Sequence, residues 1–323
     1  MEVYQDGIVR YTEKEVSYYN EDGKKVWTKK YSAINPEAKV CGQYIMIADK
    51  QNNEIYVFDK KGTMHKISTE YAIADAEIAE QGVVAVALTA KNTNYIEMYR
   101  ISGGKLVSIQ SSINENGYPL DIALSQNGKI LCASYFIVDG VQTKNRLTFY
   151  DFSKDGEKTQ NILGGYDYEN TIVPTVAFLK EDTICAFGDD KISIYHINKK
   201  VNLKKEIEME SRIKSIAYDQ SHIAIVREPN VDEVDGNNML EIFSLNGNRV
   251  GKEEISGDYT DMTLSRDRII LSSAYQTMIF SPNGRQLLDY NFKNRMIQIV
   301  PAKQKQKYFI SYQSQLNLAK LKE

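Results

Sequence analysis

The sequence contains few of the residues that form disulfides or bind zinc. Its 323 residues include only three cysteines, Cys41, Cys132 and Cys185, and three histidines. An odd, sparse set of cysteines is not a disulfide framework, and neither a Cys-x-x-Cys pair nor clustered histidines provide the spacing of a zinc site. Because Cys132 and Cys185 lie inside apolar runs, we expect them to be buried, as free cysteines usually are. We predict no metal site and no cofactor.

Long apolar runs and concentrated basic segments are also lacking. No run approaches the ~20 apolar residues that a membrane-spanning helix needs, and the opening residues 1–6 do not resemble a signal peptide. The formal net charge is −3, without the basic face typical of nucleic-acid-binding proteins. We therefore expect no nucleic-acid partner. The first strand-like run begins abruptly, which suggests that a membrane anchor has been removed from the N-terminal side, so any membrane contact would be through that segment.

Proline is scarce, at 6 residues, whereas tyrosine is frequent, at 22. Tyrosine favours half-buried β-strands. The segment Pro119–Asp151 illustrates the pattern, because it contains an apolar run, the pair Asn127-Gly128, a second apolar run, a polar loop and a third run. Asn and Gly tolerate the positive φ of tight turns, so this pair predicts a β-hairpin.

The third run of this segment recurs along the chain. Its copies follow an apolar-x-apolar-aromatic pattern, and only the last lacks the aromatic residue: 16–19, 55–58, 96–99, 147–150, 192–195, 240–243, 277–280 and 316–319. The spacing averages about 43 residues, which matches the ~40–45-residue period of four-stranded propeller blades. Most copies precede a turn that contains glycine.

Three further runs repeat around each copy: an inner strand that starts polar, a strand that is apolar on both faces, and a polar outer strand. No window has sustained helical periodicity. We therefore predict an all-β fold, a β-propeller of eight four-stranded antiparallel blades, with seven blades as the alternative. The last unit is expected to end after its third strand. Residues 1–323 would form a single domain, and the ends of the chain would pair to close the ring, as is usual in propellers.

The repeats resemble quinoprotein-type, WD40-like and lactonase-type propellers in fold. More specifically, segments 75–87, 121–128 and 148–153 resemble a family of uncharacterised Firmicutes proteins, a domain of unknown function with a propeller ectodomain. This resemblance implies an extracytoplasmic, membrane-anchored protein of a Gram-positive bacterium, and it implies no known activity. Quinone-dependent propellers repeat a tryptophan in each blade, whereas this chain has only Trp27.

The middle of the chain has the longest connections between strands, at 112–118, 135–146, 164–171 and 227–238. Insertions that gather on one face of a repeat protein indicate a binding face. Several aromatic residues lie in these segments, and we predict that they are exposed and form the binding site: Tyr118, Tyr135, Phe136, Tyr166 and Tyr168. Tyrosine suits binding surfaces, although these rings could equally pack the loops in place.

Polar residues start five of the inner strands and could surround the central channel: Asp75, Asp121, Thr175, Ser215 and Asp261. Carboxylates in a ring could bind a metal or act as a general base. The alternative is that they solvate the channel mouth and accept hydrogen bonds from backbone amides. The acidic loop Asn230–Asn237 resembles a calcium loop only superficially, because its spacing differs from that of an EF-hand.

These observations favour a non-enzymatic binding or scaffold propeller without catalytic residues. We expect it to contact a protein, a peptide or a cell-envelope glycan through the face that carries the long loops. The alternative is a metal-dependent hydrolase or lyase that uses the central aspartates. A third interpretation is a structural subunit of a membrane complex that docks through a blade edge.

Overall fold

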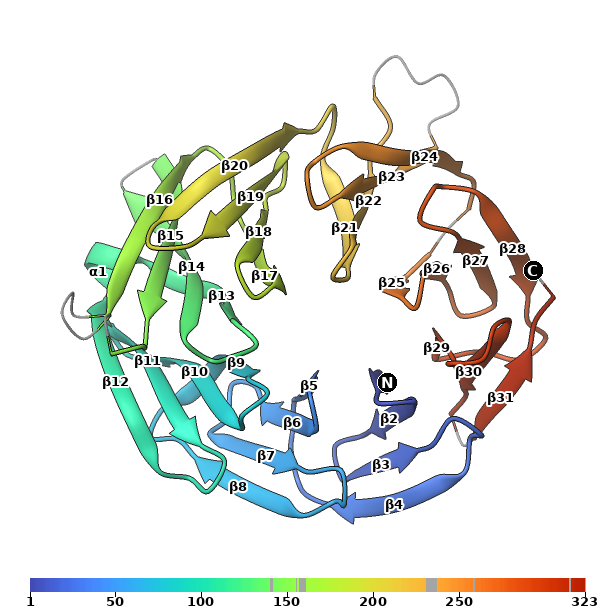
Figure 1. The fold of residues 1–323 in the computed structure, drawn as a ribbon, viewed down its shortest axis with the longest axis horizontal. Helices are drawn as coiled ribbons and strands as arrows, with labels where there is room; N and C mark the ends of the chain where they lie inside the picture. The colour runs from blue at the N-terminus through green and yellow to red at the C-terminus, as the bar shows by residue number, and fades with distance from the viewer. Residues whose placement is uncertain are drawn as a thin grey trace. The chain divides into compact units, whose positions relative to one another are not determined.

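The computed structural model describes residues 1–139, 142–154, 156, 161–230, 237–257, 259–313 and 315–322. It contains eight antiparallel sheets, and within each sheet consecutive strands of the chain lie side by side (Figure 1). Seven sheets have four strands, and the last has three. The predicted all-β, eight-bladed propeller is therefore confirmed. The only helix in the described part of the chain is the short α1 (Ile113–Asn116).

The strands follow one another blade by blade. The first four blades contain β1 (Glu2–Tyr4), β2 (Gly7–Tyr11), β3 (Glu15–Tyr19) and β4 (Lys25–Lys30); β5 (Pro36–Cys41), β6 (Tyr44–Asp49), β7 (Glu54–Phe58) and β8 (Met64–Ser68); β9 (Ala72–Ile78), β10 (Val83–Ala90), β11 (Thr93–Arg100) and β12 (Lys105–Ser112); β13 (Tyr118–Leu124), β14 (Ile130–Asp139), β15 (Gln142–Asp151) and β16 (Ile162–Glu169). The last four contain β17 (Thr175–Lys180), β18 (Thr183–Phe187), β19 (Lys191–Ile197) and β20 (Val201–Glu208); β21 (Ile213–Tyr218), β22 (His222–Arg227), β23 (Asn238–Ser244) and β24 (Arg249–Ile255); β25 (Asp261–Ser265), β26 (Arg268–Ser272), β27 (Gln276–Phe280) and β28 (Gln286–Asn291); β29 (Gln298–Pro301), β30 (Lys307–Ser311) and β31 (Leu316–Lys320).

The contacts between residues divide the chain into two compact units. Unit 1 comprises residues 1–10, 17–26 and 205–323, and unit 2 comprises residues 11–16 and 27–204. Unit 2 thus contains blades 2 to 4 and nearly all of blade 5. Unit 1 contains blades 6 to 8 and much of blade 1. Each unit is described separately below.

The core of unit 2 consists of apolar layers between successive sheets. Small and β-branched side chains from the second strand of each blade fill these layers, and one layer joins blades 2 and 3 through Met46, Val84 and Val86, among others. Cys132 lies in the layer between blades 4 and 5, and both Cys132 and Cys185 are fully buried. Burial raises the pKa of both thiols, so the predicted structural role of these two cysteines agrees with their environment.

Unit 1 has the same layered construction. Blades 6 and 7 share one layer, blades 7 and 8 share another, and a third brings Ile8 of β2 against Val300 and Phe309 of blade 8. The strands near the two ends of the chain therefore pack face to face, while β1–β4 and β29–β31 remain separate sheets. The prediction that the last blade ends after its third strand is confirmed by β31.

The predicted hairpin at Asn127-Gly128 connects β13 to β14. Gly128 has a φ of +67°, which favours glycine because a Cβ is disfavoured in this region. Asn127 contributes through its side chain instead, because its Oδ1 accepts a hydrogen bond from the Lys129 amide at 2.9 Å. In this turn, Gly128 therefore meets the requirement for a positive φ, and Asn127 adds a side-chain hydrogen bond.

Two segments predicted to be long loops are mostly strand. Residues 135–139 extend β14, and residues 142–146 begin β15, with Tyr135 paired to Arg146 in the register. Residues 164–169 likewise belong to β16. The loop predictions were wrong because residues 142–146 are polar and residues 164–169 lack a continuous apolar run, yet the backbone groups of these extensions still pair with neighbouring strands.

Candidate functional site

Two of the predicted channel aspartates bind the backbone of the next blade. In unit 2, Asp75 on β9 accepts a hydrogen bond from the Ile122 amide on β13 at 3.1 Å. Asp121 on β13 accepts one from the Val176 amide on β17 at 2.8 Å. Each carboxylate thus joins its inner strand to the next, which supports the structural alternative over the catalytic one for both residues.

Asp75 is also the centre of an ionic cluster in unit 2. Its Oδ1 lies 3.2 Å from the Nζ of Lys39 and 3.2 Å from the Nζ of Lys50. Lys39 also contacts Glu77 at 2.7 Å, and Lys50 contacts Glu37 at 3.0 Å. The Asp75 side chain is only 3% exposed, so these partners compensate a charge that would otherwise be costly to bury.

The protonation states in this cluster differ between neighbours. Burial acts to raise the pKa of Asp75, but the Lys39 ammonium and the other partners outweigh it and lower that pKa. Burial, reinforced by the charge of Asp75, raises the pKa of Asp121 well above its usual range. Burial also raises the pKa of Glu77. Burial acts to lower the pKa of Lys39, but the neighbouring carboxylates outweigh this effect and raise the pKa of Lys39. Of the two aspartates, Asp121 therefore has the higher pKa and keeps its proton to the higher pH.

The cluster does not have the arrangement of a metal site. Among the residues that the structure describes, no three His, Cys, Asp or Glu side chains are placed to hold a metal ion. Both oxygens of Asp75 are already bonded, Oδ1 by the two lysines and Oδ2 by the Ile122 amide. The bonds of Asp75 instead hold the inner strands β9 and β13 in register.

The other three residues of the predicted column have different surroundings. Ser215, in unit 1, accepts a hydrogen bond from the Tyr259 hydroxyl at 3.0 Å. Asp261, also in unit 1, is half-buried, and burial raises its pKa. Thr175 in unit 2 is half-buried at the start of β17. The acidic loop between Asn230 and Asn237 lies outside the described residues.

Exposure separates the five aromatic residues that we predicted to bind a partner. The predicted exposure of Tyr135 and Tyr168 is wrong, because they are only 1% and 8% exposed. Their hydroxyls bond those of Tyr150 and Tyr195 inside the blade layers. Tyr166 is half-buried, packs on Tyr195 with ring centroids 4.7 Å apart, and donates to the Val201 carbonyl. Strand alternation explains these positions, because the three residues lie on paired strands and not on loops.

Tyr118 is 54% exposed, and its register partner Phe136 is partly exposed. Further apolar side chains on blade 4 or at the entrance to blade 5 are exposed: Leu120 at 37%, Val138 at 59% and Ile172 at 39%. We call Tyr118, Leu120, Phe136, Val138 and Ile172 the blade-4 patch. Single exposed apolar residues are normal, whereas a group of them marks a contact surface.

A buried polar network holds the blade-4 patch in shape. Asn145 donates to the Ser134 hydroxyl at 2.8 Å, and that hydroxyl donates to the Val173 carbonyl at 2.7 Å. The Val173 amide donates in turn to Asn145 Oδ1 at 3.1 Å. Because Ser134, Asn145 and Val173 have no measurable exposure, this network fixes residue 172 against the long hairpin of blade 4.

The sequence did not predict the role of Arg227 in unit 1. Its side chain is fully buried at the end of β22 and contacts Glu241 at 3.3 Å and Glu210 at 3.1 Å. It also donates to the Glu228 carbonyl at 3.0 Å. A basic residue directly after an apolar run was the only signal, and it could equally have marked the end of a strand.

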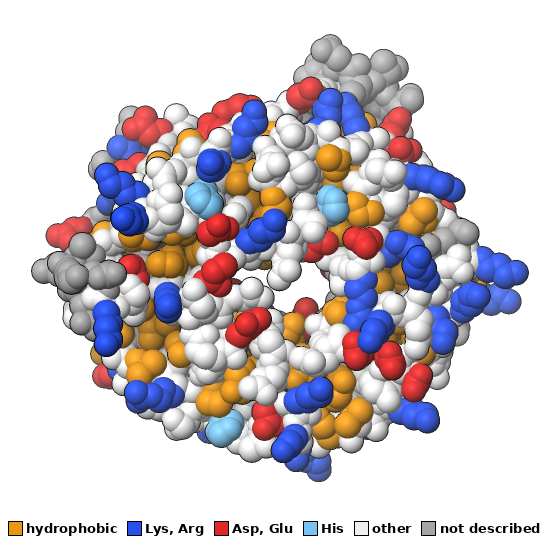
Figure 2. Space-filling model, in the orientation of Figure 1, with side chains coloured by type: hydrophobic (Ala, Val, Ile, Leu, Met, Phe, Trp, Pro, Cys, Tyr) orange, Lys and Arg blue, Asp and Glu red, His pale blue; other side chains and the backbone are white. Residues whose placement is uncertain are grey.

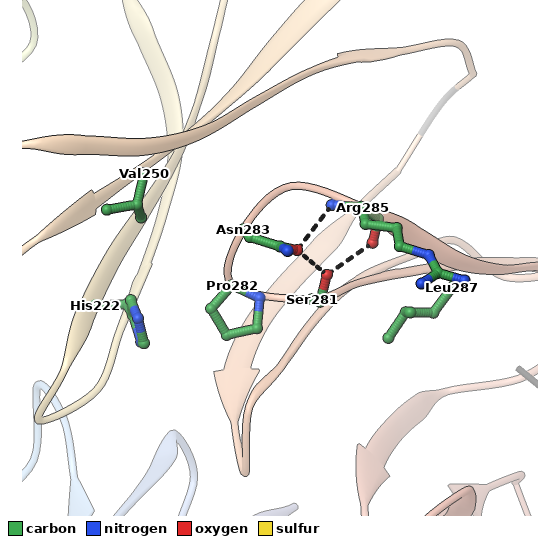
Figure 3. A pocket seen from close by; sticks show the side chains of 7 residues that line it. All are labelled: His222, Val250, Ser281, Pro282, Asn283, Arg285 and Leu287. Carbon is green, nitrogen blue, oxygen red and sulfur yellow. Dashed lines mark hydrogen bonds between the residues drawn. The ribbon is translucent and has the colours of Figure 1, made fainter.

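A shallow pocket of about 430 Å³ lies in unit 1 between β22, β24 and the turn that joins β27 to β28 (Figure 3). The close-up shows His222 and Val250 on one side and Pro282 on the other. The polar groups of the turn bond one another, since the Ser281 hydroxyl contacts the Arg285 carbonyl at 3.1 Å. The buried His222 Nδ1 has no hydrogen-bond partner among the described residues, but no other buried, unpaired polar side-chain atom of those residues lines this shallow pocket, so it is a weak candidate.

The structure resembles solved propellers at low sequence identity. It aligns with BamB from Moraxella catarrhalis at a TM-score of 0.61 and 10% identity, covering 96% of this chain and 92% of that one. The Pan2 WD40 domain of Neurospora crassa gives 0.53 and 12%, covering 85% and 84%. Apo AztD from Citrobacter koseri gives 0.56 and 9%, covering 90% and 87%. These similarities establish the fold and no more.

Sequence comparison adds a family but no characterised relative. None of the curated protein sequences matches this chain. In the described residues, no helix is long and apolar enough to cross a membrane. One family model matches residues 1–321, nearly the whole sequence. The chain therefore belongs to a family of unknown function, DUF5711.

Proposed function

We propose that this protein is a non-enzymatic binding propeller that docks a partner protein on the blade-4 patch. The observation that carries the proposal is the exposure of Tyr118 and Val138, at 54% and 59%, on the paired strands β13 and β14 of unit 2. The similarity to BamB and to a WD40 domain supports the propeller framework of this proposal. A propeller offers stiff strands with variable connections, which suits recognition by contact.

The rigidity of the patch supports a docking role. The Ser134–Asn145–Val173 network and the strand pairing of β14 with β15 hold the apolar side chains before any partner arrives. A surface that is already ordered loses little conformational entropy on binding. Tyrosine at such a site provides a large contact area with only two rotatable side-chain bonds, and it is frequent among residues that dominate binding.

The surroundings of the patch indicate the chemistry of the partner. Asp189 accepts a hydrogen bond from the Ile172 amide at 3.0 Å, and Asp190 bonds the Thr171 hydroxyl at 3.0 Å. The apolar surface therefore has carboxylates beside Ile172. We expect a protein segment that places an apolar side chain against Tyr118 and Val138 and a basic one near these aspartates.

The docking proposal can be tested by site-specific photocrosslinking in cells. A photoreactive phenylalanine replaces Tyr118, and in a matched control it replaces Leu203, which is 43% exposed on the outer strand β20. We expect a discrete protein adduct from position 118 only, and a V138D substitution should abolish it. Similar adducts at both positions, or an adduct unaffected by V138D, would contradict the proposal. An adduct that glycosidases remove would indicate a glycan instead.

We also propose that the propeller works outside the cytoplasmic membrane, on the basis of the ectodomain resemblance described above. A cysteine introduced at Leu203, which is exposed, provides the test. We expect a membrane-impermeant maleimide to label it in intact cells as efficiently as in lysed ones. Labelling only after lysis would place the protein inside the cell.

A further inference from the structure

A second pocket in unit 1 has an unusual charge. It has a volume of about 330 Å³ and lies between the turn that joins β25 to β26 and the loop that joins β29 to β30. Five of its lining residues are cationic, Arg266, Arg268, Lys303, Lys305 and Lys307, whereas Asp267 is its only acidic one. The chain as a whole has a net charge of −3, so this excess of positive charge is local. Figure 2 shows Lys and Arg side chains gathered over the area where β25 and β29 lie in Figure 1.

Hydrogen bonds hold part of this basic surface in place. Arg266 donates to the Gln5 carbonyl at 3.0 Å and to the Pro301 carbonyl at 3.4 Å. Arg268 donates to the Asp267 carbonyl at 2.9 Å. These neutral carbonyls orient the two guanidinium groups, and the carboxylates of Asp6 and Glu21 also act on Arg266. Guanidinium groups fixed in this way favour the planar, paired contacts that phosphate oxygens provide.

The lysines differ in their ion pairs. Lys303 lies 2.9 Å from a carboxylate oxygen of Asp6, so its charge is partly compensated. By contrast, no ion pair involving Lys305 or Lys307 exists within the described ranges of the chain. A cluster of like charges is unfavourable without counter-charge, and an anion of two negative charges would relieve it.

The pocket also contains an acceptor without a donor. The side-chain oxygen of Gln304, one of the lining residues, is buried and has no hydrogen-bond partner among the described residues. A buried acceptor normally finds a donor. The dianion of a phosphate monoester has no O–H of its own, whereas a hydroxyl group on its alcohol part can donate. Among phosphate esters, this requirement favours one that carries such a hydroxyl.

We propose that the pocket between β25–β26 and β29–β30 binds the phosphate group of a hydroxylated phosphomonoester, with Arg266, Arg268, Lys305 and Lys307 around the phosphate and Gln304 accepting a hydroxyl. The ligand is either a free sugar or polyol phosphate or the same chemistry presented by a lipid headgroup. The site goes beyond the docking proposal, because it lies in unit 1 and uses none of the residues of the blade-4 patch.

The test is calorimetric titration of the full chain with glycerol 3-phosphate, with inorganic phosphate and with glycerol at constant ionic strength. We expect glycerol 3-phosphate to bind more tightly than inorganic phosphate, and glycerol alone not to bind. The double variant K305Q/K307Q should weaken both anions by about tenfold or more, since each lost charged hydrogen bond has roughly this effect. The control K199Q/K200Q makes the same charge change at two exposed lysines of unit 2 and should bind like the parent.

A third variant tests the role of the glutamine. Q304A should lower the affinity for glycerol 3-phosphate more than it lowers the affinity for inorganic phosphate. Co-sedimentation with phosphatidylcholine vesicles that contain phosphatidylinositol 4-phosphate distinguishes the source of the ligand. Vesicle binding that K305Q/K307Q abolishes supports the pocket with a lipid headgroup as its ligand. The proposal is overturned if neither probe binds, or if K305Q/K307Q and K199Q/K200Q bind equally.

Discussion

The ionic cluster around Asp75 in unit 2 and the basic pocket around Arg266 in unit 1 contain similar residues with opposite consequences. Lys39 and Lys50 each lie within 3.2 Å of two carboxylates. They share Asp75, whose side chain is nearly buried. In the basic pocket, the arginines donate to neutral carbonyls instead. The first group of charges is balanced by the fold, whereas Lys305 and Lys307 in the second group have no ion pair among the residues that the structure describes.

This difference in charge balance indicates how the Asp75 cluster and the basic pocket contribute to folding and to ligand binding. Balanced and buried charges hold strands together, and removing one of them leaves its partners in a poorly solvated environment. Unbalanced charges at an open pocket contribute little to folding and are available to a ligand. Charge balance, more than charge content, therefore separates the structural cluster from the candidate ligand site in this propeller.

The largest effect is expected from D75A in unit 2. The substitution leaves Lys39 and Lys50 with one carboxylate fewer each and removes the acceptor of the Ile122 amide. We expect the free energy of unfolding to fall by about 3–5 kcal/mol, as for other broken buried pairs. Urea denaturation monitored by circular dichroism measures the change.

The control for D75A is E54A, which removes the partner of Lys66 in a half-exposed pair of the same unit. This variant should lose less than about 1 kcal/mol. Equal losses in D75A and E54A would show that the cluster is no more important than a surface ion pair.

An intermediate effect is expected from D121N, and it depends on pH. The folded pKa of Asp121 is raised, so above the ~3.9 pKa of an unfolded aspartate the folded state keeps a proton that the unfolded state has released. The free energy of unfolding of the parent therefore falls as the pH rises through this window, by at most about 1.4 kcal/mol per pH unit. The amide that D121N introduces has no titratable proton but can still donate a hydrogen bond to Asp75.

We therefore expect D121N to have a flatter pH dependence than the parent and to gain stability relative to it as the pH rises. Thermal melting between pH 4 and pH 8 measures both curves. Parallel curves would show that Asp121 is ionised in the folded protein. D75N offers a useful contrast, because the folded pKa of Asp75 is lowered and its stabilising charge is lost only as the pH falls below the unfolded value.

The smallest effect is expected from K305Q in the basic pocket of unit 1. Removing one cation from a group of like charges should raise the free energy of unfolding by at most about 0.5 kcal/mol, because the residue is exposed. Salt at ~1 M screens charges beyond about 3 Å and should remove the gain. A marked destabilisation would show that Lys305 contributes to folding and would contradict its assignment to the ligand site.

The blades could be predicted from the sequence because each third strand carries the same local pattern, and strand alternation is a local property. The aromatic residue at its end, such as Tyr150 or Tyr195, is buried in the layer between blades. The length of the hairpin formed by β14 and β15 could not be predicted in this way. Residues 142–146 of β15 are polar, and only the pairing of their backbone groups with β14 makes them a strand.

The candidate sites were predicted less well, because they depend on neighbours that are distant in sequence. Asp75 and Asp121 were recognised as a column, but the lysines that compensate Asp75 come from another blade, 36 and 25 residues away along the chain. Tyr135 was expected on a loop, and its burial follows from the extended register of β14. The pocket around Arg266 combines two turns whose basic residues are unremarkable when read separately.

The hydrogen bonds from Ile122 to Asp75 and from Val176 to Asp121 also have a consequence during synthesis. The amide that bonds each aspartate is synthesised roughly one blade later than the aspartate. The separation is 47 residues for Asp75 and 55 residues for Asp121. A nascent chain that stops before residue 122 leaves Asp75 with its lysines but without its backbone donor. The hydrogen bonds of the inner strands β9 and β13 are therefore complete only once the first strand of the following blade has been synthesised.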